Sequence, residues 1–89
     1  MAWKVEFGRD AQKELEKLDK PVSRRILRFL DQRVARLDDP RKIAERLRGS
    51  LSEFWRYRVG DYRIICSLEH DRFVVLVLRI GHRREVYSR

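Results

Sequence analysis

Residues 54–80, FWRYRVGDYRIICSLEHDRFVVLVLRI, decide the fold of this chain. Aromatic and β-branched residues dominate the stretch, as they do in β-strands. Two short interruptions, Gly60-Asp61 and His70-Asp71, have the length of hairpin loops. The pattern therefore predicts a three-stranded antiparallel meander.

The first interruption also fixes which residues of the meander face one another. If Gly60-Asp61 is a two-residue turn, Arg58 lies opposite Arg63, and Arg56 follows two residues along on the same face. Like charges directly opposite each other destabilise a sheet, so we interpret the cluster as a phosphate-binding patch. The alternative is a solvated surface whose arginine stems pack on the sheet, and a one-residue bulge would scatter the cluster.

The same register divides the meander between two faces. The arginines share their face with Ile65, Leu76 and Leu78, whereas the other face carries Trp55, Tyr57, Ile64, Cys66, Val75 and Val77. We expect the aromatic-rich face to pack on helices and the arginine-bearing face to line an open groove with an apolar floor.

The N-terminal residues predict a single strand and a short helix. Trp3, Val5 and Phe7 alternate with charged residues, as in a strand with one buried face. Gly8 then breaks the strand, and Asp10 is placed to cap a short helix.

A longer helix follows the short one. Pro21 suits its first turn, where a missing N–H costs nothing. Its apolar stripe is Val22, Ile26, Phe29, Leu30, Val34 and Leu37, and its basic back is Arg24, Arg25, Arg28, Gln32 and Arg36. Asp38-Asp39-Pro40 ends this helix, and residues 41–49 predict a helical turn or little order. The fold class is thus α+β, in one domain spanning residues 1–89: a strand, a two-helix hairpin and the meander in one sheet.

The charge of the chain indicates a polyanionic partner. The 89 residues carry a formal net charge of +8, and the pI is about 10.4. An excess of this size in so short a chain is typical of nucleic-acid binding. Charge alone also fits simple solubility, an anionic membrane surface or an acidic protein.

Several other classes of protein are excluded. The single Cys66 leaves no internal disulfide framework and no cysteine-based zinc site. The first four residues, MAWK, lack the apolar core of a secretory signal, and no apolar run approaches the roughly 20 residues that span a bilayer. We therefore expect a cytoplasmic protein that does not enter a membrane.

The C-terminal run, residues 80–89, is the second informative segment. Gly81 permits the chain to leave the last strand sharply. His82, Arg83 and Tyr87 would then return over the sheet and bring an imidazole, a cation and a phenol toward the arginine patch. The alternative is a frayed basic tail.

Three motifs together resemble the RelE branch of the RelE/ParE toxin superfamily. They are Leu47-Arg48-Gly49, residues 55–64 (WRYRVGDYRI) and residues 81–87 (GHRREVY). The order of the predicted elements also agrees with that family. The resemblance implies a type II toxin that enters the ribosomal A site, cleaves mRNA there and so inhibits translation. It also implies a cognate antitoxin protein, bound in a heterotetramer or a larger complex.

The resemblance implies roles for single residues as well. Such ribonucleases use the RNA's own 2′-hydroxyl as nucleophile and leave a 2′,3′-cyclic phosphate, with no metal or other cofactor. Arg63 and Arg83 would stabilise the charge that grows on the phosphate, and Tyr87 would stack on a base, transfer a proton or do both. The RNA phosphates would be bound by Arg48, Arg56 and Arg58.

The chain departs from the family pattern at the proton acceptor. The family often has lysines where this chain has Arg56 and Arg58, and an arginine stays protonated. The acceptor must then lie elsewhere. We favour Tyr87, because nearby positive charge lowers the pKa of a phenol, and His82 stays open.

Two other functions compete with the ribonuclease. A ParE-type toxin would poison DNA gyrase without cutting RNA, as a binding module. The joint presence of Arg63, Arg83 and Tyr87 favours the nuclease over it. The third alternative is a degenerate family member kept for RNA binding or for sequestering the antitoxin.

Overall fold

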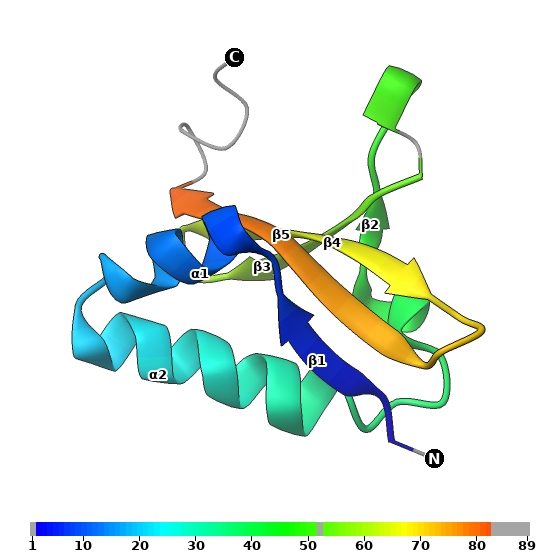
Figure 1. The fold of residues 1–89 in the computed structure, drawn as a ribbon, viewed down its shortest axis with the longest axis horizontal. Coiled ribbons are helices and arrows are strands. Elements are labelled where there is room, and N and C mark those ends of the chain that lie inside the picture. Colours follow the sequence, from blue (N-terminus) through cyan, green and yellow to red (C-terminus); the bar gives the residue numbers. More distant parts are fainter. Residues whose placement is uncertain (1, 52, 83–89) are drawn as a thin grey trace.

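The computed structural model describes residues 2–51 and 53–82. Among these residues, a five-stranded mixed sheet with the order β1-β5-β4-β3-β2 carries two helices on one face (Figure 1). The strands are β1 (Lys4–Phe7), β2 (Glu45–Arg46), β3 (Trp55–Val59), β4 (Tyr62–Glu69) and β5 (Val74–His82), and the helices are α1 (Arg9–Glu16) and α2 (Lys20–Phe29). The predicted α+β class is confirmed, with one strand more than expected in the described part of the chain. No helix within that part has the length and apolar character needed to cross a membrane.

β1 forms as predicted and joins the sheet by parallel pairing with the first part of β5. The backbone of Gly8 is extended, its N–H donates to the carbonyl of Val77 at 2.8 Å, and α1 begins at the next residue. Asp10 therefore lies inside the first turn of α1. Its predicted role as the helix cap is wrong, because Gly8 occupies the N-cap position and the helix start has no side-chain cap.

α2 has Pro21 in its first turn, as predicted. After Phe29 the chain makes one π-helical turn, Leu30–Val34, and the helical segment then ends before the predicted end at Asp38-Asp39-Pro40. The carbonyl of Ala35 accepts the N–H of Trp3 at 2.7 Å. The N-terminal segment thus satisfies a carbonyl that a further helical turn would have used.

β3, β4 and β5 form the predicted meander. Gly60-Asp61 is the two-residue turn between β3 and β4, and Gly60 has the positive φ of 58° that such tight hairpin turns require. The second turn is longer than predicted, because it takes in residues 70–73. In this turn Phe73 has a φ of 53°, a left-handed conformation that is unusual for a bulky side chain.

β5 is longer than predicted at its C-terminal end. The sharp exit expected at Gly81 is wrong, because β5 continues through Gly81 to His82. β4 supplies a partner for each of these residues, Arg63 for Gly81 and Tyr62 for His82. Backbone pairing between the two strands therefore continues to His82.

β2 was not expected from the sequence. The helical turn expected after residue 40 is present as a short 3₁₀ helix, Pro40–Ile43. β2 follows it and pairs antiparallel with β3, with Glu45 opposite Arg56. A strand of two residues is too short to show the alternation of apolar and polar residues by which strands are recognised.

The core lies between the helices and the sheet face assigned to them. Tyr57, Ile64, Cys66, Val75 and Val77 of that face are all buried in it, as predicted, whereas Trp55 is only half-buried and lies outside this cluster. Burial raises the pKa of the Tyr57 phenol, whose hydroxyl donates to the carbonyl of Pro40 at 2.8 Å. Burial also raises the pKa of the Cys66 thiol, which is therefore an inert core group.

Candidate functional site

The arginine patch has the predicted register. Arg58 lies directly opposite Arg63, and Arg56 lies opposite Ile65. Alternation along the strands directs the three arginines toward the sheet face away from the helices. At the β3 side of the sheet, however, the long side chains of Arg56 and Arg58 also line a groove with Phe29. The like charges that the sequence placed across from one another are therefore neighbours in the structure.

The apolar floor expected beside these arginines is partly covered. Ile65 is buried against Leu47 and Phe54, which form a small second cluster on the outer face. An open groove at Ile65 is therefore wrong, because the segment that follows β2 folds over this residue. Arg48 comes directly after Leu47 and is exposed to solvent.

Two of the three arginines pair with one carboxylate from β2. Arg56 donates from Nε and from a terminal nitrogen to Glu45 Oε1, at 2.9 and 2.6 Å. Arg58 Nε lies 3.2 Å from the same oxygen. The hydrogen bond from Arg56 is the main cause that lowers the pKa of Glu45, with Arg58 adding to it. One carboxylate shared by two guanidiniums leaves the patch positive.

Arg63 differs from the other two arginines. Its Nε is buried, and within the described residues it has no hydrogen-bond partner. A buried donor without a partner costs about 1–3 kcal/mol. Gly81, across the ladder from Arg63, has no side chain that could meet this need. Arg63 is thus the arginine of this patch whose guanidinium has no carboxylate partner within the described part of the chain.

His82 does not join the arginine patch. It is the last residue of β5, and its ring meets that of Tyr62 edge-on, with ring centres 5.9 Å apart. Tyr62 packs against the main core, so this pair lies on the helix side of the sheet, the face opposite Arg63. The other two C-terminal candidates, Arg83 and Tyr87, lie outside the described residues.

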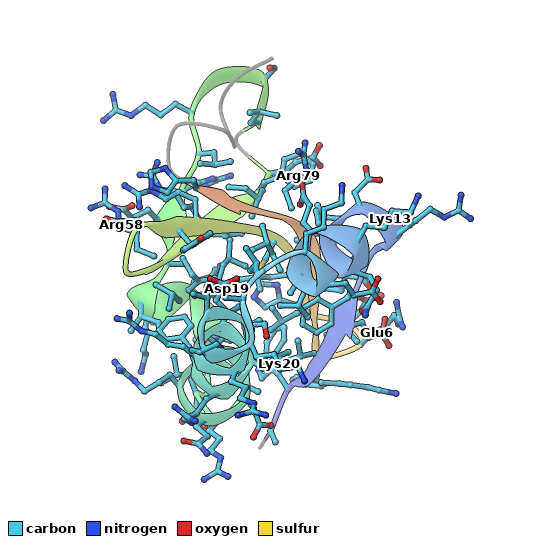
Figure 2. All side chains as sticks on the ribbon, turned by 90° about the vertical axis from the view of Figure 1, so that its left-hand side faces the viewer. Glu6, Lys13, Asp19, Lys20, Arg58 and Arg79 are labelled. Carbon is cyan, nitrogen blue, oxygen red and sulfur yellow. The ribbon has the colours of Figure 1, made fainter. Side chains whose placement is uncertain are left out.

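A second basic surface lies between α2 and β3, and in Figure 2 the labelled Arg58 marks its β3 side, well away from α1. A groove of about 450 Å³ is lined there by Arg25, Arg28, Phe29, Gln32, Arg33, Arg58, Val59 and Gly60. Arg33 lies over the ring of Phe29, 5.9 Å from its centre. Within the described chain, Arg25, Arg28 and Arg33 have no carboxylate partner, so this groove also favours anions.

Sequence reasoning missed two residues of these surfaces. Glu45 was not considered because its strand was not predicted. Arg33 was left off the basic back of the helix, although it faces the groove with Arg25 and Arg28. Arg33 follows Leu30 by three residues and Phe29 by four, a helical spacing that puts it beside these apolar residues. The π-helical turn Leu30–Val34 then changes the direction in which Arg33 points.

The sequence matches a known family over most of its length. Residues 5–87 fit the sequence model described as the ParE toxin of the type II toxin-antitoxin system, parDE. The chain belongs to this family. It is therefore a toxin of the RelE/ParE superfamily, and the predicted resemblance is confirmed.

Individual relatives are of the RelE type. Toxin RelG of Mycobacterium tuberculosis (strain ATCC 25618 / H37Rv) is 27% identical to this toxin over 89 residues, which is 100% of both chains. The toxin also superposes on the toxin-antitoxin complex RelBE2 of M. tuberculosis, with a TM-score of 0.85, 25% identity and coverage of 96% of this chain and 95% of that one. The intact E. coli RelBE complex gives a TM-score of 0.74, 25% identity and coverage of 91% and 96%.

Proposed function

We propose that this toxin is a metal-independent endoribonuclease that cleaves mRNA in the ribosomal A site and so inhibits translation in the cytoplasm. The observation that carries the proposal is Arg63, a partly buried cation whose Nε has no hydrogen-bond partner in the described chain and which faces Gly81. A phosphate bound at the terminal nitrogens of Arg63 would supply the anionic partner that this guanidinium lacks among the described residues. The RelE-type relatives and the excess of cations on two surfaces support the same conclusion.

The reaction would be an attack of the RNA 2′-hydroxyl on the adjacent phosphorus. A base takes the 2′ proton, a bond forms between the 2′-oxygen and phosphorus, and the bond to the 5′-oxygen breaks, which leaves a 2′,3′-cyclic phosphate. The departing 5′-oxygen takes up a proton. Arg63 and Arg83 would stabilise the extra negative charge on the phosphoryl oxygens, and Arg48, Arg56 and Arg58 would hold neighbouring phosphates.

Proton acceptance is assigned to Tyr87 rather than His82. His82 packs against Tyr62 on the face opposite Arg63, so an RNA phosphate bound at Arg63 would lie across the sheet from it. The phenol of Tyr87 becomes a usable base where guanidinium groups surround it, because positive charge favours the phenolate.

The decisive experiment expresses the wild type and a variant with both Arg83→Ala and Tyr87→Ala, and maps mRNA 5′ ends on stalled ribosomes. We expect growth arrest with cuts in the A site for the wild type alone. Equal toxicity of the two proteins would remove both residues from catalysis. A wild type that binds RNA and antitoxin without arresting growth would indicate a degenerate member of the family.

The second candidate function is that of a gyrase poison. It is favoured by the description of the matching family, which names ParE toxins. The same experiment separates the two, because a gyrase poison would leave mRNA intact and damage DNA.

We also propose that the toxin binds a cognate antitoxin through an acidic segment. Two of the solved relatives, RelBE2 of M. tuberculosis and RelBE of E. coli, are toxin-antitoxin complexes. In this chain, the groove between α2 and β3 offers guanidinium walls with the ring of Phe29 between them, which suits an amphipathic acidic segment. A heterotetramer or a larger assembly is the expected form of the complex.

Replacing Arg25 and Arg28 by alanine is expected to weaken antitoxin binding. Exposed ion pairs contribute about 0.2–1 kcal/mol each, so the loss of two predicts an increase in Kd of about 2-fold to 30-fold at low salt. The difference should shrink as salt screens the charges. Isothermal titration at several salt concentrations measures both effects.

The matched control removes the same number of charges elsewhere. Lys4 on β1 and Lys42 in the 3₁₀ helix are exposed and do not line the groove. The double variant Lys4→Ala/Lys42→Ala should change the Kd far less. An equal loss in both variants would mean that net charge, and not this groove, attracts the antitoxin.

A further inference from the structure

β5 has two different neighbours along one edge. β1 pairs with it only from Val74 to Val77, and the N–H of Gly8 closes this pairing at Val77. β5 then continues to His82, and α1 lies beside this second part, as Figure 1 shows. The helix thus takes the place that a strand would have at this edge.

A carboxylate of α1 replaces the missing strand. Glu14 Oε1 accepts the backbone N–H of Ile80 at 2.7 Å. Glu14 Oε2 accepts two hydrogen bonds from Arg79, from Nε at 3.0 Å and from a terminal nitrogen at 2.8 Å. Figure 2 shows Arg79 next to α1. Both carboxylate oxygens are therefore committed to two consecutive residues of β5.

This contact is more than a surface ion pair. The side chains of Glu14 and Arg79 are only 27% and 33% exposed. The hydrogen bond to Glu14 is the main cause that raises the pKa of Arg79. A charge-assisted, forked contact of this kind fixes the geometry of both partners more tightly than a single bond between exposed groups.

The contact lies directly beside the proposed site. Ile80, a core residue that is 2% exposed, precedes Gly81, the residue across from Arg63. Arg83 follows two residues later in the sequence. We propose that Glu14 is a positioning residue for RNA cleavage: it holds the end of β5 so that Gly81 stays opposite Arg63. This inference rests on the ribonuclease function proposed above.

The test compares Glu14→Ala and Glu14→Gln with the wild type in cleavage of mRNA on programmed ribosomes. A displacement of about 1 Å at a catalytic site can cost about 100-fold in rate, so we expect kcat to fall by about 10-fold to 100-fold in Glu14→Ala. The KM for ribosomes should stay within about twofold, because ground-state binding is left intact. Glu14→Gln keeps an oxygen for the Ile80 N–H and loses the charge that holds Arg79, so its kcat should lie between those of the wild type and of Glu14→Ala.

Glu16 provides the matched control on the same helix. Among the described residues, its exposed carboxylate accepts only a hydrogen bond from Gln12, at 3.1 Å, so Glu16→Ala should leave kcat unchanged. Amide NMR spectra give a readout that does not depend on activity: the signals of Ile80, Gly81 and His82 should shift in Glu14→Ala and stay in place in Glu16→Ala.

The outcomes separate the two proposals. An active wild type with an equally active, folded Glu14→Ala overturns the role of Glu14 alone, as do unshifted signals of Gly81 and His82. A wild type that cleaves no RNA overturns the ribonuclease function and with it this role, whereas the amide signals still decide whether Glu14 holds the strand. A merely structural role would lower the Tm of Glu14→Ala without lowering the kcat of the folded protein, and this result would also overturn the proposal.

Discussion

Replacing Arg63 by alanine is expected to slow mRNA cleavage by about 100-fold to 1000-fold, the usual cost of removing one preorganised donor from a site where negative charge develops. The reason is that the two neighbouring arginines share Glu45, whereas Arg63 has a buried Nε without a partner in the described residues. Single-turnover cleavage on programmed ribosomes measures the loss directly.

Arg63→Ala should lose activity without losing stability. Removing a buried donor that has no partner also removes its desolvation cost, so we expect Arg63→Ala to unfold at the same urea concentration as the wild type or a higher one. Loss of activity without loss of stability is the signature of a residue kept for binding. A structural arginine would show the reverse.

Two further variants complete the experiment. Arg63→Lys keeps the charge and loses the planar fork, so its rate should fall between those of the wild type and of Arg63→Ala. Arg72→Ala is the control: this arginine pairs with Glu69 and Glu6 near the turn between β4 and β5, at the other end of these strands. A normal rate in Arg63→Ala, or an equal loss in Arg72→Ala, would contradict the assignment of Arg63.

The register of the arginine patch was predictable because it depends on a local feature. Gly60, at positive φ in a two-residue turn, fixes which residues of β3 and β4 lie opposite each other. The irregularity in the β4–β5 ladder, between Ile65 and Cys66, comes after the arginine pair on β4, so it leaves Arg58 opposite Arg63. Arg56 and Arg58 could therefore be placed without any knowledge of the rest of the fold.

The carboxylate contacts in and beside the patch were not predictable because their partners are distant in sequence. Glu45 reaches Arg56 across 11 residues through a strand too short to leave a pattern. Glu14 reaches Ile80 across 66 residues, and on a helical wheel it looks like any other solvated glutamate of α1. Only the relative position of helix and strand shows that these two carboxylates have partners.

The two tryptophans show the same limit in the core. Alternation assigns both Trp3 and Trp55 to buried positions. In the structure Trp3 is 5% exposed and packs edge-on against His70 and Phe73, with ring centres 5.1 and 5.5 Å away. Trp55 is half-buried and has the guanidinium of Arg46 5.7 Å from the centre of its ring. Trp55 pairs with β2 near the edge of the sheet, outside the main core.

Trp3→Ala is therefore expected to destabilise the fold far more than Trp55→Ala. Truncating a fully buried tryptophan costs about 3–5 kcal/mol, a large part of the 5–15 kcal/mol that typically holds a protein folded. For the half-buried Trp55 we expect about 1 kcal/mol, the usual size for a single substitution. Urea unfolding followed by circular dichroism compares the two free energies of unfolding.

A third variant separates packing from hydrogen bonding at Trp3. The indole N–H donates to the carbonyl of Asp38 at 3.3 Å, and Trp3→Phe removes this bond while keeping an aromatic ring. Such a hydrogen bond contributes about 0.5–1.5 kcal/mol, so most of the loss in Trp3→Ala should be absent from Trp3→Phe. Equal losses in Trp3→Ala and Trp55→Ala would mean that the ring cluster at the turn between β4 and β5 contributes little. The N-terminal strand would then be held by its backbone pairing with β5 and not by the tryptophan that precedes it.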